Sequence, residues 1–134
     1  MFTEESDDVL RIIDECGLDY AQLHVGQSED FARTIGADRV IRVARVKDES
    51  SIAGLADYQI AAFYLLDAYK KGQAGGTGET FNWDLAAQAK SLPKPIFLSG
   101  GLNPENISDA IRLVRPFAVD VSSRVERSPG VKDI

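Results

Sequence analysis

The chain has 134 residues, of which 44% are hydrophobic and 27% charged, and it carries a net charge of −6. This length suffices for one globular domain with a buried core, and an acidic chain without a basic patch argues against nucleic-acid binding. No run approaches the roughly 18–20 apolar residues of a membrane span. The acidic N-terminus is unlike a signal peptide, so we expect a cytoplasmic protein. A single cysteine excludes an intramolecular disulfide framework and, with a single histidine, argues against a metal site.

Helical and β-rich stretches alternate through the first third of the chain. A helix is predicted from the Ser6-Asp7-Asp8 cap to a stop at Gly17, and a second helix from Ser28 to about Gly36. Strands are predicted at residues 20–25 and 39–46, the second because charged residues alternate with β-branched apolar ones.

The same alternation continues to the end of the chain. The helix after residue 102 is predicted to begin with Asn103 as its cap and Pro104 in its first turn. The tail at residues 128–134 is predicted to be loose. The other elements are a short helix at 50–56, strands at 60–66, 95–99 and 117–122, a glycine-rich loop at 70–82 and a helix at 83–91.

Strands separated by helices indicate βαβ units and a parallel sheet, so the predicted class is α/β. Five strands are clear, and a sixth can end at Phe2. A complete (β/α)8 barrel takes about 250 residues. We therefore expect one domain over residues 1–134 with about five to six βα units, as an incomplete (β/α)8 (TIM) barrel or rearranged as an open sheet.

Three predicted strands end in residues suited to chemistry, which in parallel α/β proteins gathers at the carboxyl ends of strands. Gly100 and Gly101 stand between a strand and a helix, where backbone N–H groups can approach an anion. Together with Ser122 and Ser123 on the next strand they predict a phosphate site, although tight-turn geometry alone also explains the glycines. Asp67 either orients the loop that follows it or acts as a general acid.

Six segments are similar to phosphoribosylanthranilate isomerases: QLHVGQ, LLDAY, GGTGETFNWDLA, LSGGLNPENISDAI, RPFAVDVSSRVE and SPGVKD. They occur in the family's order and cover nearly the whole chain. The resemblance implies a (β/α)8 barrel and a place in tryptophan biosynthesis. It also implies an Amadori rearrangement of N-(5-phosphoribosyl)anthranilate, an aldose–ketose isomerisation, with no metal or organic cofactor.

The resemblance also assigns roles to residues. Asp67 is the general acid that protonates the furanose ring oxygen. The small-molecule partner is a phosphorylated sugar-anthranilate, or phosphate itself. The implied binding residues are Gly100, Gly101, Ser122 and Ser123 for the phosphate, and Gly75, Gly76, Thr77 and Gly78 in a loop over the ribose.

The chain departs from the family at its start. It begins near the end of the family's third strand, so we expect it to be N-terminally truncated and to lack the first two βα units. With them would go the Lys-Ile-Cys-Gly motif, whose cysteine is the general base, and an arginine on the anthranilate side. Cys16 does not replace that cysteine, because it lies near a predicted helix C-terminus, where the helix dipole disfavours a thiolate.

Two further departures leave alternatives open. Arg124 stands where the family usually has glycine, so it either pairs with phosphate or obstructs a loop that needs glycine's freedom. His24 lies in a turn with one residue more than the family's usual turn. We favour a core or supporting role for this histidine over a catalytic one.

Three functional readings follow. The chain is an isomerase that is weak or inactive without the cysteine; a non-catalytic phosphate-binding barrel fragment; or a piece that complements the missing part of a barrel. Exposed sheet edges predict a homo-oligomer. A flavodoxin-like nucleotide module is disfavoured, because the spacing of Gly72–Gly78 does not fit a phosphate loop.

Overall fold

A parallel five-stranded sheet forms the centre of the computed structural model, which describes residues 6–24, 26–67 and 83–133. Its strands pair in sequence order, each parallel to the next, as a chain of right-handed βαβ units does. Within these residues β1 and β5 each pair on one side only. The strands are β1 (Ala21–His24), β2 (Val40–Arg45), β3 (Phe63–Asp67), β4 (Ile96–Ser99) and β5 (Ala118–Val119).

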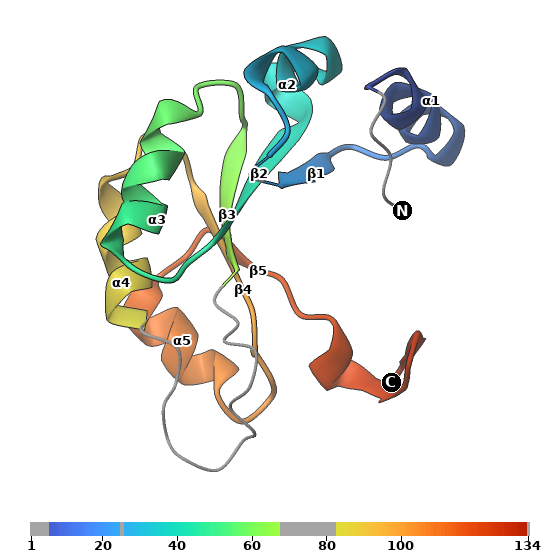
Figure 1. Cartoon of the computed structure of the whole chain (residues 1–134). Helices are drawn as coiled ribbons and strands as arrows, with labels where there is room; N and C mark the ends of the chain where they lie inside the picture. The colour runs from blue at the N-terminus through green and yellow to red at the C-terminus, as the bar shows by residue number, and fades with distance from the viewer. Residues whose placement is uncertain (1–5, 25, 68–82, 134) are drawn as a thin grey trace.

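The helices α3, α4 and α5 lie along one face of the sheet, while α1 and α2 lie beyond β1 and the start of β2 (Figure 1). None of the helices in the described part of the chain is long and apolar enough to cross a membrane. The helices are α1 (Ser6–Cys16), α2 (Glu29–Ile35), α3 (Glu49–Ala53), α4 (Trp83–Gln88) and α5 (Ile107–Val114); short 3-10 helices are η1 (Ala37–Arg39), η2 (Gly54–Asp57), η3 (Ala89–Ser91) and η4 (Ser123–Val125).

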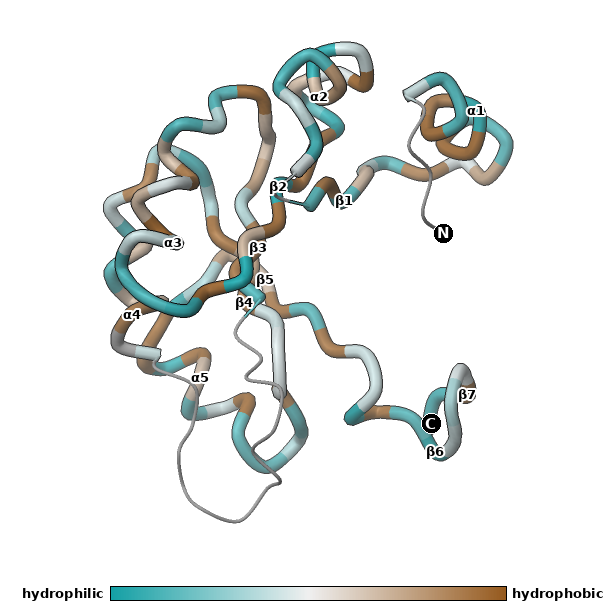
Figure 2. Tube along the Cα trace, viewed as in Figure 1, coloured by the Kyte–Doolittle hydropathy of each residue, from teal (hydrophilic) through white to brown (hydrophobic). Residues whose placement is uncertain are grey.

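The two faces of the sheet have different surroundings. Successive side chains of a strand point to opposite faces. Tyr64, Leu66 and Leu98 belong to the main core, which includes apolar residues from all five helices. The other face holds a small second cluster of Ile41, Val43 and Leu65, with no helix in it. Figure 2 shows hydrophobic residues concentrated in the central strands and mixed with hydrophilic ones along the helices.

Aromatic rings gather at the amino end of this second face. The ring of Phe63 lies 4.9 Å from Phe97, 5.3 Å from Phe117 and 5.4 Å from Tyr20, measured between centroids. Phe117 is nevertheless 67% exposed and Tyr20 45% exposed. Parallel sheets are normally covered on both faces, so this face carries apolar surface that the described chain leaves uncovered.

The side chain of Arg42 is fully buried on the helix-covered face of β2. Its Nη1 donates to the Gln27 carbonyl at 2.8 Å, its Nη2 donates to Glu29 Oε1 at 3.2 Å, and its guanidinium lies 4.2 Å from the centre of the Tyr58 ring. Glu29 Oε2 also accepts from the Ile60 backbone N–H. Burial lowers the pKa of Arg42, and the nearby Glu29 carboxylate opposes that shift.

Most predicted elements are confirmed in type, but several boundaries differ, most of all in the strand predicted at 117–122, of which β5 keeps Ala118–Val119. Strand β3 begins at Phe63 and not at residue 60, because the Ile60 N–H is taken by Glu29. Helix α3 begins earlier than predicted, since the Asp48 side chain caps it by accepting from the Ser51 N–H. Asn103 accepts from two backbone N–H groups as a cap does, but it closes a turn first, and α5 itself begins at Ile107. The possible strand ending at Phe2 lies outside the described residues.

The prediction of a loose tail is wrong. Strands β6 (Glu126–Ser128) and β7 (Val131–Lys132) form an antiparallel hairpin around Gly130, whose φ of 79° suits glycine. Lys132 Nζ lies 2.9 Å from Glu126 Oε1. This hydrogen bond, followed by one from the Gly130 backbone, lowers the pKa of Glu126. The short loop and this ion pair order residues that the sequence leaves without an apolar pattern.

Replacing Glu29 tests the role of the buried Arg42. Glu29→Ala removes the carboxylate partner and leaves a desolvated guanidinium, so we expect the free energy of unfolding to fall by about 3 kcal/mol. Urea denaturation measures it. The matched control is Asp30→Ala, since this neighbouring carboxylate is 96% exposed and its loss should change stability by no more than about 0.5 kcal/mol. Equal effects of the two substitutions would contradict the role assigned to Glu29.

Candidate active site at the carboxyl edge of the sheet

Polar side chains form a row across the carboxyl ends of four neighbouring strands. Arg45 of β2 is in register with Asp67 of β3, and Asp67 with Ser99 of β4. The Ser99 hydroxyl donates to Asp120 Oδ2 at 3.2 Å, just after β5. All four residues alternate onto the face that α3, α4 and α5 leave open. The fold thus brings a cation, two carboxylates and a hydroxyl to one edge.

Asp67 lies where the sequence predicts it, at the last position of β3. Its side chain is 26% exposed, and its Oδ2 is 4.0 Å from Nε of Arg45. Its backbone carbonyl accepts from the Val46 N–H, which holds the end of β3 against β2. The carboxylate is therefore accessible from the open face and fixed in position by the ladder, as a general acid needs to be. Its catalytic role stays a prediction.

The Gly100-Gly101 turn follows β4 with φ angles of 90° and 67°, which side chains rarely adopt. Asn106 holds this turn: its Nδ2 donates to the Gly101 carbonyl at 3.0 Å, and its Oδ1 accepts from the Asn103 N–H at 2.9 Å. The turn leads into the start of α5. A strand, a glycine pair and a helix N-terminus in succession are suited to an anion.

Ser122 and Ser123 follow β5 and are exposed at the same edge, where Ser123 begins a 3-10 turn that includes Arg124. Lys132 Nζ donates to the Ser122 carbonyl at 3.0 Å, so the terminal hairpin is fastened to this segment. Arg124 is exposed as well. The predicted phosphate residues are brought together on adjacent strand ends, but phosphate binding by these residues, Arg124 included, stays a prediction.

Other residues singled out in the sequence lie elsewhere. The segment Gly75, Gly76, Thr77 and Gly78 is outside the described residues. His24 ends β1 with an exposed side chain, so it is not a core histidine, and its interpretation as a supporting histidine stays a prediction. Cys16 is exposed at the end of α1, ahead of β1, and thus at the amino side of the sheet, away from Asp67. Nowhere in the described ranges do three or more metal-ligating side chains gather in a group.

Three residues of the edge were missed in the sequence: Arg45, Asp120 and Asn106. Arg45 looked like one more charged residue of an alternating strand, and only the β2–β3 register shows that it faces Asp67. Asp120 falls inside the strand predicted at 117–122, whereas in the structure it follows the end of β5. Asn106 carried a usable signal, since an asparagine three residues after Asn103 can close a turn.

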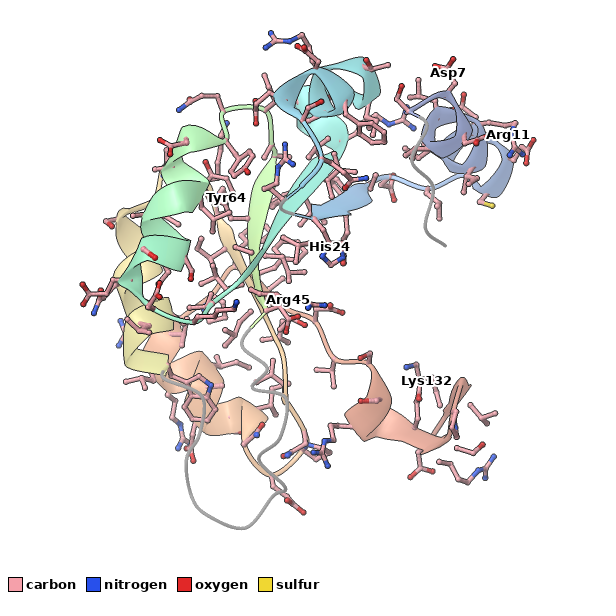
Figure 3. All side chains as sticks on the ribbon, viewed as in Figure 1. Asp7, Arg11, His24, Arg45, Tyr64 and Lys132 are labelled. Carbon is pink, nitrogen blue, oxygen red and sulfur yellow. The ribbon has the colours of Figure 1, made fainter. Side chains whose placement is uncertain are left out.

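A concavity of about 1360 Å³ lies around β1, α1 and α3 and not over Asp67. It is open, and it reaches the row at its β2 end, where His24, Arg45 and Lys47 line it. Figure 3 shows His24 and Arg45 on the side of the sheet away from α3 and α4. The row is therefore bordered by hollow space at the β2 end and by the glycine and serine turns at the β5 end.

Residues 2–134 match the protein family described as N-(5'phosphoribosyl)anthranilate (PRA) isomerase. The chain belongs to the phosphoribosylanthranilate isomerase family. The curated isomerase of Citrifermentans bemidjiense is 50% identical over 129 residues, which cover 96% of this chain and 61% of that protein. The isomerase of Aquifex aeolicus is 43% identical over 125 residues, covering 93% of this chain and 60% of the relative. The chain thus spans about three fifths of the length of these relatives.

Solved isomerases share the fold. The enzyme from Thermotoga maritima superposes with a TM-score of 0.84 at 40% identity, covering 99% of this chain and 64% of the other. A second isomerase structure was solved in complex with reduced 1-(o-carboxyphenylamino)-1-deoxyribulose 5-phosphate; it has a TM-score of 0.80 at 38% identity, with 98% and 61% covered. The family assignment made from sequence motifs is confirmed.

The Gly101 turn gives a test of the edge's backbone geometry. Gly101→Ala places a Cβ in open space but at a φ of 67°, so we expect a loss of about 1–2 kcal/mol from backbone strain alone. Gly101→Asn should lose less, because asparagine tolerates this conformation. Chemical denaturation compares both with Gly54→Ala, whose Cβ also meets nothing within 4 Å and whose φ is ordinary. Equal losses for alanine at positions 101 and 54 would refute the strained turn.

Proposed function

We propose that the chain is a phosphoribosylanthranilate isomerase unit that binds its phosphorylated substrate along the carboxyl edge of the sheet. The observation that carries the proposal is the row from Asp67 to Asp120, with the Gly100-Gly101 and Ser122-Ser123 turns beyond it. The turns would hold the phosphate through backbone N–H groups and hydroxyls, with Arg124 beside them. The sugar would then lie over β3 and β4.

In the proposed reaction Asp67 is the acid. It gives a proton to the furanose ring oxygen while the C1–O bond breaks, and the aniline nitrogen supplies the electron pair that forms the C1=N⁺ Schiff base. A base then removes the proton from C2, and those electrons form the C1=C2 bond of an enolamine while nitrogen becomes neutral. Tautomerisation of the C2 enol gives the ketone. The chemistry thus needs one positioned acid and one positioned base.

A base for the second step is not assigned in this chain. Its one cysteine, Cys16, is exposed at the amino side of the sheet, where it cannot reach a sugar bound near Asp67. We therefore propose weak or no turnover by this chain alone, because a positioned acid–base group contributes roughly 10²–10⁴-fold to a rate. In this reading residues 1–134 are one domain, a partial (β/α)8 barrel.

Asp67 and the phosphate turns are tested together. We expect inorganic phosphate to bind the chain, measured by calorimetry, and substrate turnover, followed by the loss of substrate fluorescence, to be slow. Asp67→Asn should abolish any turnover while leaving phosphate affinity unchanged, because the phosphate turns lie on the next two strands. Asp109→Asn is the control, since that carboxylate is exposed on α5.

Three outcomes would count against the proposal. Absence of phosphate binding would mean that the turns after β4 and β5 do not form an anion site. Turnover that survives Asp67→Asn would remove Asp67 as the acid. Turnover as fast as that of the related isomerases would contradict the proposal of weak or no turnover.

The second candidate function is a non-catalytic phosphate-binding domain that self-associates. The observations behind it are the exposed aromatic rings of Phe117 and Tyr20 and the strands β1 and β5, each paired on one side within the described residues. A two-fold axis along the strand direction would place β5 of one copy beside β1 of the other, parallel to it. We propose that copies associate in this way, since exposed edges and apolar faces attract partners.

Phe117 tests this association. Sedimentation velocity of the chain should show a species larger than a monomer, with a share that grows with concentration. Phe117→Ser should reduce that share, because the exposed ring leaves the interface. Leu113→Ser is the matched control, since Leu113 is an exposed apolar residue of α5, on the other side of the sheet. A monomer at every concentration, or equal effects of both variants, would contradict the proposal.

A further inference from the structure

Three cations surround a small hollow at the amino edge of the sheet, the edge opposite to the candidate active site. The hollow has a volume of about 280 Å³ and lies between the starts of β4 and β5 and the ends of η3 and α5. Lys90, Lys94 and Arg115 line it, and none of the described residues around it is acidic. In a chain of net charge −6, this is a local concentration of positive charge.

These cations are not balanced by carboxylates of the described chain. Six arginines elsewhere in the described ranges each lie within 4.0 Å of a carboxylate oxygen. None of the three cations at the hollow forms such a pair with a described residue. The side chains of Lys90 and Arg115 are exposed and that of Lys94 is half-buried. Their N–H donors are therefore available to a ligand.

The sheet itself brings two of the cations together. Lys94 and Arg115 each stand before a proline that leads into a strand. The register pairs Phe97 of β4 with Ala118 of β5, and the same offset places Lys94 beside Arg115. Neighbouring strands are about 4.8 Å apart, so two like charges that repel each other begin on adjacent chains. An anion between them would replace this repulsion with attraction.

Arg115 also has an unfavourable backbone conformation. It follows α5 with a φ of 48° and a ψ of 55°, and it is the one non-glycine residue with a positive φ in the described part of the chain. Glycine or asparagine is usual at this position of a helix end, because a larger side chain is strained there. The helix dipole does not require this arginine, since Arg112 already places a cation in the last turn of α5. Such outliers cluster at functional positions.

We propose that this hollow is a second binding site, which takes a small anion whose several negative charges match the three cations. Its volume is near the lower end of the roughly 300–1,000 Å³ of small-molecule sites, so the ligand has few non-hydrogen atoms. The Arg115 guanidinium offers two parallel N–H donors to an oxyanion, and the two lysines act as point charges beside it. The site is independent of the proposed function, because it lies at the other end of the strands.

Pyrophosphate and citrate are the probes, because each carries several negative charges on a small frame. We expect at least one of them to bind the chain in calorimetry and to shift the amide NMR signals at the starts of β4 and β5. Binding of pyrophosphate alone would identify the ligand as a phosphate compound, and binding of citrate alone as a carboxylate. Lys94→Met and Arg115→Asn should each weaken that binding about tenfold, since each removes charge-assisted hydrogen bonds. Asparagine accepts the left-handed conformation, so Arg115→Asn adds no backbone strain.

Controls separate this site from the one at the carboxyl edge. Arg33→Met removes an exposed arginine of α2 and should leave the affinity for both probes unchanged. Inorganic phosphate, proposed to bind the turns after β4 and β5, should bind Lys94→Met and Arg115→Asn as it binds the unaltered chain. Amide shifts confined to those turns, unchanged affinity in both variants, or binding of neither probe would overturn the inference and leave the proposed function standing.

Discussion

The buried guanidinium of Arg42 is the interaction on which the arrangement of the first three strands depends. It joins β2 to the β1–α2 connection through Gln27, to α2 through Glu29 and to the α3–β3 connection through Tyr58. A charge without water tolerates few arrangements, because every lost partner leaves a desolvation cost of several kcal/mol. The segments around β2 are thereby held in one position. Three residues later on the same strand, Arg45 reaches Asp67 in the register that this packing maintains.

The sheet separates stability from chemistry by its two faces and its two ends. Tyr64, Leu66 and Leu98 turn toward the helices and make the main core. On the opposite face the amino half carries aromatic and aliphatic side chains, while the carboxyl ends carry Arg45, Asp67 and Ser99. Since neighbouring positions on one strand serve opposite faces, the packing of the core fixes where the polar row stands. On the open face, the apolar amino half of the sheet is suited to burial against another surface, whereas the polar carboxyl end is suited to contact with solvent or a ligand.

The sequence predicted the parts of the fold that local patterns encode. Apolar runs gave the central strands, and Ser28 was correctly expected to start α2, where its hydroxyl accepts from the Phe31 N–H. Boundaries failed where a long-range contact decides them, as at Ile60, whose N–H is held by Glu29 thirty-one residues earlier. The prediction of a loose tail failed because the terminal hairpin is held by the Glu126–Lys132 pair, and its residues show no hydrophobic periodicity in the sequence.

The candidate site divides in the same way. Asp67, the glycine pair and the serine pair were found because each follows a strand, and parallel strands end at one edge. Arg45 and Asp120 were not predicted as site residues. Their place in the row depends on the register between strands and on the face of the sheet to which each side chain points, and neither can be read from the sequence. The role of Arg42 was not predicted at all. The alternation of charged and apolar residues in this strand suggested an exposed charged position, whereas the structure buries the Arg42 side chain.

Charges of both signs lie across the carboxyl edge of the sheet. Arg45 stands at the β2 end, and Arg124 and Lys132 stand near the β5 end, where Lys132 is tied to the Ser122 carbonyl. Between them lie the carboxylates of Asp67 and Asp120, which repel anions and can accept hydrogen bonds. A uniformly basic edge would attract anions along its whole length. Cations at the two ends with carboxylates between them attract anions at the ends, and an overall charge of −6 is compatible with this because Coulomb interactions beyond about 10 Å are screened.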